Sequence, residues 1–181
     1  DAIVIDGMQA GTGASAELLL DHSGIPTMAA IVMAREALKE LGLLGKVSLI
    51  ASGGIRNGAD AAKAIALGAD AVAVGIAPLI ALNCNKEIPE SDFLKEVGVP
   101  AGQCHHCQTG KCPVGIATQD PELQKRLDPD QGAERVANFL NAMTMEISLL
   151  TRSLGKGDVH SLEPEDLAAL TIEASAMARI P

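Results

Sequence analysis

Four cysteines are the residues of this chain whose types and spacing point most directly to chemistry. They follow the pattern C-x19-C-x2-C-x4-C, formed by Cys84, Cys104, Cys107 and Cys112, and Pro113 comes directly after the last one. Thiolates at such short spacing can converge on one iron–sulfur cluster, and a proline after a ligand stiffens the chain. Four thiolates also suit a tetrahedral structural zinc ion. The spacing alone therefore predicts a metal site and leaves iron–sulfur and zinc open.

Two glycine-containing segments follow apolar runs and predict a phosphate site. They are Ser52-Gly53-Gly54-Ile55-Arg56 and Gly75-Ile76-Ala77. Ligands of parallel α/β folds bind beyond the carboxyl ends of the strands, and in (β/α)8 barrels the last two of these loops often hold a phosphate. Glycine lets backbone N–H groups approach phosphate oxygens closely. We expect the phosphate ligands to be Ser52, Gly53, Gly54, Gly75 and Ile76. A third glycine-bearing loop, residues 7–15, is on its spacing equally compatible with a plain connection.

The elements that would position these residues alternate between strand and helix. Short apolar runs predict buried parallel strands at residues 2–6, 47–51 and 71–74. Helices are predicted between them, over residues 27–41 and from Asn57 or Asp60 to Gly68. Such βαβ repeats build right-handed parallel sheets. The fold class is therefore α/β, either a barrel or a doubly wound sheet.

The first of these helices has predicted ends and a predicted buried face. Thr27 is a plausible N-cap and Gly42 a C-terminal stop. The apolar residues at helical spacing, expected to be buried, are Met28, Ile31, Leu38 and Leu41.

The periodicity is lost between residues 83 and 120, which predicts an irregular loop. A long helix is expected after Pro129, ending at Gly155 and Gly157. Its apolar stripe consists of Val136, Leu140, Met143, Ile147, Leu150 and Leu154. A last helix is predicted to start at Pro164 and to run through Leu167 and Leu170.

Composition narrows the class of protein. Apolar residues make up 48% of the 181 residues and aromatic residues only 1%, so the core must be aliphatic. A net charge of −9 argues against nucleic acid and against an anionic membrane surface, because both require clustered cations. No apolar stretch reaches the roughly 20 residues that span a bilayer, and no signal peptide is present. We expect a cytoplasmic protein, in which close cysteines favour metal or redox chemistry. The start at Asp1, without Met, predicts a fragment or a processed piece.

The cysteine loop resembles a known family. Residues 77–84 and residues 107–121, which contain Cys-Pro-Val-Gly-Ile-Ala-Thr-Gln, resemble the cluster loop of glutamate synthases. Residues 50–75 look like the phosphate corner shared by flavin barrels and inosine monophosphate dehydrogenases. Residues 7–15 look like the glutamate synthase loop that borders the flavin and the 2-oxoglutarate site, with Ala10 in place of a glycine. Residues 162–167 look like a closing segment of the same family.

The resemblance implies specific cofactors and ligands. It implies an FMN, with an active-site role for Gly11, Thr12 and Gly13, and a 3Fe-4S cluster held by Cys84, Cys107 and Cys112. Cys104 has no counterpart in the family pattern, and residues 85–103 form an insertion. Cys104 could replace Cys84 as a ligand, or join it as a fourth ligand and complete a 4Fe-4S cluster, so both cluster types remain open.

The implied fold is the C-terminal portion of a (β/α)8 TIM barrel, with a Cys-rich loop and C-terminal helices. Its expected division is residues 1–83 for the last barrel units, residues 84–121 for the cluster loop and residues 122–181 for a helical segment. The implied reaction is reductive amination of 2-oxoglutarate by ammonia to give glutamate, with electrons passed through the cluster to the flavin. A relative that uses methylamine would share these motifs. Implied partners are a glutaminase domain or subunit, and an NAD(P)H-reductase subunit or ferredoxin.

Two other functions compete with this one. An inosine monophosphate dehydrogenase-like barrel would use a catalytic cysteine soon after Gly75, but it leaves three thiols without a role. A cluster-bearing electron-transfer subunit would have no catalysis of its own, and retention of FMN would distinguish it.

Overall fold

The computed structural model describes residues 1–11, 15–84, 95 and 107–181. Its residues fall into two compact units. The first comprises Asp1–Gly11, Glu17–Gly75 and Asn141–Pro181, and the second comprises Thr12–Ala16 and Ile76–Leu140.

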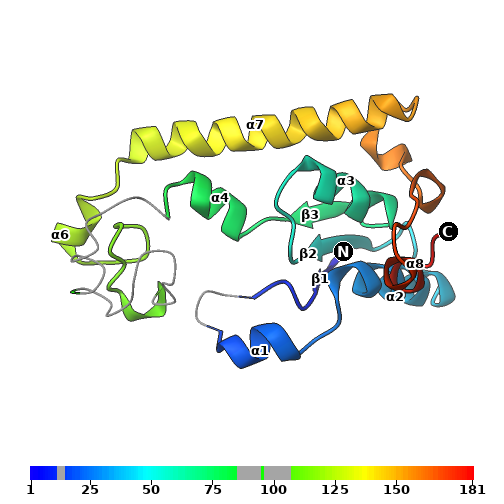
Figure 1. The fold of residues 1–181 in the computed structure, drawn as a ribbon, viewed down its shortest axis with the longest axis horizontal. Helices are drawn as coiled ribbons and strands as arrows, with labels where there is room; N and C mark the ends of the chain where they lie inside the picture. Colours follow the sequence, from blue (N-terminus) through cyan, green and yellow to red (C-terminus); the bar gives the residue numbers. More distant parts are fainter. Residues whose placement is uncertain (12–14, 85–94, 96–106) are drawn as a thin grey trace. The chain divides into compact units, whose positions relative to one another are not determined.

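A three-stranded parallel sheet lies at the centre of the first unit (Figure 1). Its strands are β1 (Ala2–Asp6), β2 (Ser48–Ser52) and β3 (Ala71–Ala73), in the order β1-β2-β3. In the register, Asp6 lies opposite Ser52, and Ser52 lies opposite Ala73. The predicted positions of the strands, their parallel pairing and the α/β class are confirmed. The predicted burial is wrong for β1 and β3, which are mostly exposed in this chain, and only β2 carries fully buried residues.

Helices connect and cover the strands of this unit. They are α1 (Glu17–His22), α2 (Thr27–Glu40), α3 (Gly58–Ala66) and α8 (Ile172–Ala178). Their buried residues pack with the middle strand into one aliphatic core, which includes Ile31, Leu38, Leu49, Ala51, Ala64 and Leu67. Small and branched aliphatic side chains thus fill this core, as expected for a sequence with few aromatic residues.

The ends of α2 and α3 follow largely from local sequence. Asn57 caps α3, since its side-chain oxygen accepts a hydrogen bond of 2.9 Å from the N–H of Asp60. Gly42 and Gly68, which follow the two helices, have φ values of +68° and +117° and end them as predicted. The prediction of Thr27 as N-cap is wrong, because Pro26 holds that position and Thr27 is already helical.

The buried face of α2 is also only partly as predicted. Ile31 and Leu38 are buried, whereas Met28 is 37% and Leu41 71% exposed. Thr27 and Val32 are buried instead. The apolar spacing therefore predicted Ile31 and Leu38 correctly but gave no sign that the polar Thr27 is buried.

The described part of the second unit holds short helices and one end of a long one. The short elements are α4 (Ile76–Ala81), the 3-10 turn η1 (Cys107–Thr109) and α6 (Pro121–Gln124). The long helix α7 (Pro129–Ser153) starts in this unit and continues into the first. It ends as predicted, with Gly155 at φ +73° shortly after its last turn. Met143 is the buried member of its predicted apolar stripe.

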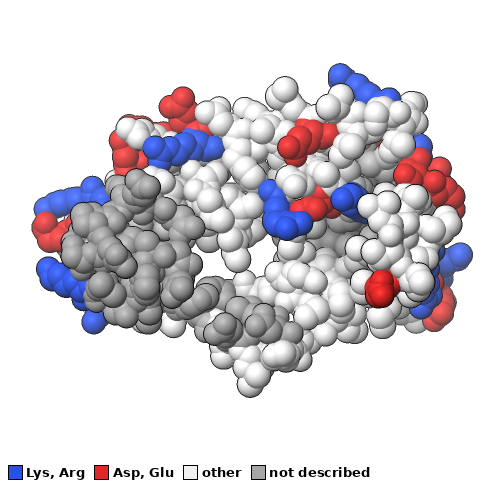
Figure 2. Space-filling model, in the orientation of Figure 1, with Lys and Arg blue, Asp and Glu red and all other residues white. Residues whose placement is uncertain are grey.

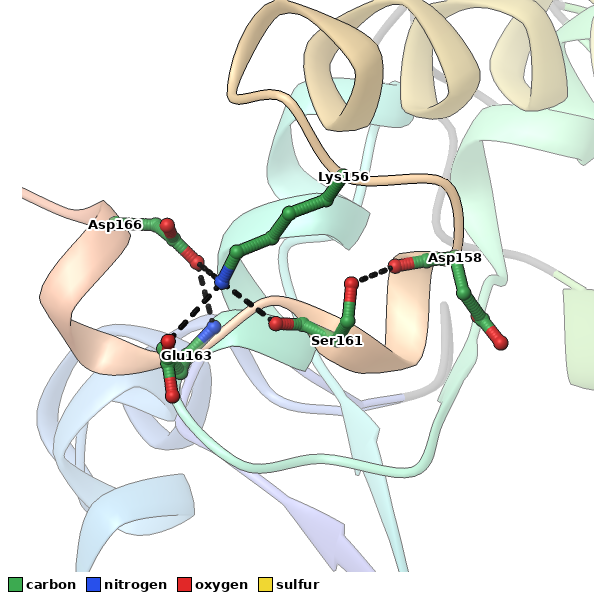
Figure 3. Close-up of polar contacts among 5 residues, drawn as sticks. All are labelled: Lys156, Asp158, Ser161, Glu163 and Asp166. Carbon is green, nitrogen blue, oxygen red and sulfur yellow. Dashed lines mark hydrogen bonds and ion pairs between the residues drawn. The ribbon is translucent and has the colours of Figure 1, made fainter.

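The prediction of a last helix starting at Pro164 is wrong. The chain forms two 3-10 turns, η2 (Val159–Ser161) and η3 (Pro164–Asp166), and Leu167 is extended. An ionic clasp, shown in Figure 3, joins these turns: Lys156 Nζ lies 2.5 Å from Asp166 Oδ2 and 3.2 Å from Glu163 Oε1. Asp166 also accepts from the N–H of Glu163 at 2.8 Å and forms a capping box there, but the chain leaves the helical conformation at Leu167 after a single turn.

The surface carries both signs of charge. On the face drawn in Figure 2, basic and acidic side chains lie close together at several places. Within the described residues, no helix combines the length and apolarity needed to cross a membrane.

Candidate functional site

The predicted phosphate residues lie at the carboxyl ends of two neighbouring strands. Since β2 and β3 pair in parallel with Ser52 opposite Ala73, Gly53 and Gly75 each follow a strand end at the same edge of the sheet. Gly53 and Gly54 have φ values of +110° and +74°. Gly53 and Gly75, 22 positions apart in sequence, are therefore brought to one corner, as predicted.

The backbone at this corner fits a phosphate group. Gly53 and Gly54 have no Cβ of their own to cover the main chain of this turn, and the side chains of Thr27 and Gln9 pack against it. A Cβ built on Gly75 would meet no atom of the described residues within 4 Å, so these residues leave the space beside it open. Ile76, the last predicted phosphate ligand, is exposed and begins α4.

The loop after β1 packs directly against this corner. The N–H of Gly7 donates to the carbonyl of Ser52 at 3.0 Å. A Cβ on Gly53 would come within 2.7 Å of both Ala10 N and Thr27 Oγ1. The loop after β1, the start of α2 and the loop after β2 thus meet at Gly53, and no space is left there for a side chain.

A cavity of about 280 Å³ opens beside the glycine turn. Gly53, Gly54 and Arg56 form one part of its lining, and apolar residues of α2 and α3 form much of the rest. Its charged groups are Arg56, Lys63 and Asp60. The Nε of Arg56 lies 3.1 Å from Asp60 Oδ2, and the Arg56 side chain is 78% exposed, so its charge is partly neutralised and largely solvated.

Only part of the predicted active-site loop is described. Gly11 is exposed and has a φ of +132°. Thr12 and Gly13 lie outside the described residues.

The cysteines are described except for Cys104, which lies outside the described residues. Cys84 is half-buried, Cys107 is exposed in η1, and Cys112 is buried beside Val114. Among the described side chains, no three Cys, His, Asp or Glu residues come together as metal ligands. The described thiols do not by themselves form a cluster site.

The loop around Cys112 is nevertheless held in place by polar contacts. The Thr118 hydroxyl donates to Gly110 O at 2.5 Å, and Arg126 Nη1 donates to Pro113 O at 2.7 Å. Gly115 has a φ of +86°, and a Cβ there would lie 2.5 Å from Leu123 O. The tail of the predicted cluster loop is thus tied to the segment around α6.

Titratable groups with shifted pKa values belong to the clasp region after α7. The hydrogen bond from Lys156 to Asp166 is the main cause that raises the pKa of Lys156 and lowers the pKa of Asp166. The pKa of Asp158 is lowered chiefly because the N–H of His160 donates to its carboxylate. Hydrogen bonds that close turns explain these shifts, so we assign the groups a structural role.

Sequence reasoning missed two residues of the corner. Gln9 Oε1 accepts from the N–H of Thr27 at 2.9 Å and from its hydroxyl at 2.8 Å. A polar residue at position 27 was noticed only as a cap. Thr27 is buried against Gly7 and Gly53, which come from two other parts of the chain. Such a contact depends on tertiary packing and leaves no local signal in the sequence.

A family model described as a conserved region in glutamate synthase matches residues 1–89 and 94–157. A glutamate synthase large subunit-like protein of Rhizobium meliloti is 51% identical over 181 residues, 100% of this chain and 41% of the relative. An archaeal glutamate synthase [NADPH] of Methanocaldococcus jannaschii is 48% identical over 162 residues, 90% of this chain and 28% of the relative.

A third relative is similar along almost the whole chain, at lower identity. An archaeal-type glutamate synthase [NADPH] of Dehalococcoides mccartyi is 39% identical over 176 residues, 97% of this chain and 32% of the relative. The chain spans about two fifths of the length of the Rhizobium relative and less than a third of the other two. On the matched family region and on this identity along its length, the chain belongs to the glutamate synthase family.

Proposed function

We propose that this chain forms part of an FMN-dependent glutamate synthase, an oxidoreductase that converts 2-oxoglutarate and ammonia to glutamate. The observation that carries the proposal is the corner at which Gly53, Gly54 and Gly75 follow two neighbouring parallel strands. The names of the relatives, which include glutamate synthase, support the proposed reaction class, reductive amination.

In this proposal the FMN phosphate binds to backbone groups of Ser52, Gly53, Gly54, Gly75 and Ile76. Arg56 is close in sequence, but its ion pair with Asp60 makes it a secondary source of positive charge. Bound FMN would supply hydride transfer, while the protein provides orientation and electrostatics. Gly11, Thr12 and Gly13 would border the flavin ring and the substrate.

We further propose that the three strands are the last strands of a (β/α)8 barrel. Parallel sheets are normally covered on both faces, yet Ile3 and Val4 of β1 are 43% and 56% exposed. In a closed barrel, packing of the interior would cover the side chains on one face of β1, and the outer helices would cover those on the other. The proposed division remains residues 1–83, 84–121 and 122–181, with the helical segment packed on the barrel.

The cysteines are proposed as ligands of an iron–sulfur cluster on the basis of their spacing. Cys84, Cys107 and Cys112 would suffice for a 3Fe-4S cluster, and Cys104 would add the fourth ligand of a 4Fe-4S cluster. Iron and sulfide analysis with electron paramagnetic resonance of the wild type and of Cys104→Ser tests the choice. The iron content and the signal of the wild type give the cluster type, and C104S shows whether Cys104 is a ligand: an unchanged signal supports ligation by Cys84, Cys107 and Cys112 alone, and loss of the signal supports ligation by Cys104. Zinc in place of iron would contradict both.

The proposed partners are a source of ammonia and a source of electrons. A glutaminase domain or subunit would supply ammonia, and methylamine is the alternative amine. The names of two relatives contain NADPH, which favours an NADPH-linked reductase over ferredoxin as electron donor.

The function is tested with the full-length protein, purified without oxygen. We expect flavin absorption bands that bleach on reduction, and formation of glutamate from 2-oxoglutarate and ammonia. Replacing ammonia with methylamine tests the second amine. Protein that binds no flavin, or that binds FMN but forms neither glutamate nor N-methylglutamate, would contradict the proposal.

A further inference from the structure

Thr27 is a buried polar residue at the point where three segments of the first unit meet. Its side chain is 7% exposed. A Cβ on Gly7, at the end of β1, would lie 2.1 Å from Thr27 Oγ1, and a Cβ on Gly53 would lie 2.7 Å from the same atom. The hydroxyl therefore touches the glycine that ends β1 and the glycine that follows β2.

Gln9 completes this contact from the loop after β1. One oxygen, Oε1, accepts both the N–H and the hydroxyl hydrogen of Thr27, at 2.9 and 2.8 Å. The stem of the same side chain lies under the turn, since a Cβ on Gly54 would come within 3.1 Å of Gln9 Cβ. Gln9 thus satisfies the first N–H of α2, which lacks a side-chain cap from Pro26, and supports Gly54.

We propose that Thr27 and Gln9 are positioning residues that hold the glycine turn at Gly53 and Gly54 in the conformation that binds phosphate. This inference rests on the proposed FMN site and assigns a role to two residues outside it. Glycine adopts φ values of either sign readily, so Gly53 and Gly54 do not fix their own turn. The buried hydroxyl and the amide stem limit the space in which the turn can move.

We call the contact of Thr27 and Gln9 with the glycine turn the clamp. Two substitutions remove it, and two preserve it. Thr27→Val keeps the shape of the side chain and removes the hydroxyl, whereas Thr27→Ser keeps the hydroxyl. Gln9→Ala removes the acceptor, whereas Gln9→Glu keeps one. Thr151→Val is the matched control, because Thr151 is a threonine of the same unit that is 3% exposed and donates at 2.8 Å to Ile147 O within α7.

The readouts are the FMN dissociation constant of the full-length protein and amide hydrogen exchange of residues 7–11 and 53–56 without flavin. We expect T27V and Q9A each to weaken FMN binding about fivefold, which corresponds to ~1 kcal/mol. Exchange in both segments should accelerate. T27S and T151V should stay within about twofold of the wild type, although T151V loses a buried hydrogen bond. Q9E is compared by amide exchange alone, where it should match the wild type, because its carboxylate adds negative charge beside the proposed phosphate site.

Each outcome decides the question. Wild-type FMN affinity and exchange in T27V would overturn the inference, as would an equal loss in T151V, which would indicate general destabilisation. If the wild-type protein binds no FMN, the proposed function fails. In that case the exchange data still decide whether the clamp fixes the turn.

Discussion

At the scale of single residues, the phosphate corner depends on a glycine at position 53 for two separable reasons. Its φ of +110° disfavours any residue with a Cβ, and a Cβ there would also meet Ala10 N and Thr27 Oγ1 at 2.7 Å. Gly45 shares only the first constraint, because its φ is +75° and a Cβ there would meet nothing within 4 Å.

We therefore expect Gly53→Ala to destabilise the protein more than Gly45→Ala. The strained φ costs roughly 1–2 kcal/mol in both variants. Overpacking adds about 1–3 kcal/mol at position 53 alone. Urea unfolding of the two variants measures the difference, and equal losses of unfolding free energy would show that the contacts around Gly53 can relax.

The Lys156 clasp predicts a dependence of stability on pH at both extremes. The pKa of Asp166 is lowered from 3.8, so its contribution is present above that value and is lost as the pH falls through the folded pKa. The pKa of Lys156 is raised from 10.5, so its contribution is present below that value and is lost as the pH rises through the folded pKa.

Lys156→Gln should therefore lower the melting temperature near neutral pH and reduce the loss seen at acid pH. Lys125→Gln serves as the control, because the Lys125–Glu122 pair is solvent-exposed at 69% and 80%, against 20% and 14% for Lys156 and Asp166. Thermal melts across the pH range compare them. If K125Q lowers the melting temperature as much as K156Q does, the clasp is no more than a surface ion pair.

At the scale of elements, α3 and the last half of α7 approach each other closely in the first unit. A Cβ on Gly58 would lie 2.4 Å from Met143 O and 2.5 Å from Glu146 Cβ. The N–H of Gly58 donates to Glu146 Oε2 at 2.6 Å. Gly58 therefore lets the start of α3 contact the backbone of α7.

We expect Gly58→Ala to cost about 1–3 kcal/mol, although alanine is the better helix former by about 1 kcal/mol. Gly132→Ala is the matched substitution within α7. A Cβ there would meet Leu82 Cδ1 at 2.8 Å, which is the end of a flexible side chain. Equilibrium unfolding should show G132A close to the wild type. A G58A variant as stable as G132A would mean that the two helices can separate without loss.

The helices and strands show which parts of the fold could be predicted from the sequence. Apolar runs predicted β1, β2 and β3, and cap residues such as Asn57 and Gly42 predicted helix ends, because these signals are local. The helix expected at Pro164 was wrong, because the proline and the capping box are local signals for a helix start only and do not predict that the chain becomes extended at Leu167. The short helices α1, α4 and α6 were not predicted either, since their few residues carry little periodicity.

The candidate site was predictable to a similar extent. Glycines at strand ends predicted the phosphate corner, because parallel neighbours share an edge. Thr27 and Gln9 were missed, because their contact joins a loop to a helix 18 positions away. The grouping of all four cysteines remains a prediction, since Cys104 lies outside the described residues.

At the scale of the whole molecule, the chain corresponds to one part of its relatives in the glutamate synthase family. The relatives extend well beyond the matched region, as the chain covers 41% of one and 28% of another. The exposed side chains of β1 indicate where further parts of such a protein would pack. The phosphate corner is the part of the proposed active site that this chain supplies by itself.

The most direct test is FMN titration of the full-length protein carrying Gly75→Val, with Gly157→Val as control. Neither glycine has a positive φ, and a Cβ on either would meet nothing within 4 Å, so both variants should fold like the wild type. We predict that G75V binds FMN at least about tenfold more weakly, while G157V stays within about twofold. Wild-type FMN affinity in G75V would contradict the assignment of this corner to the flavin phosphate.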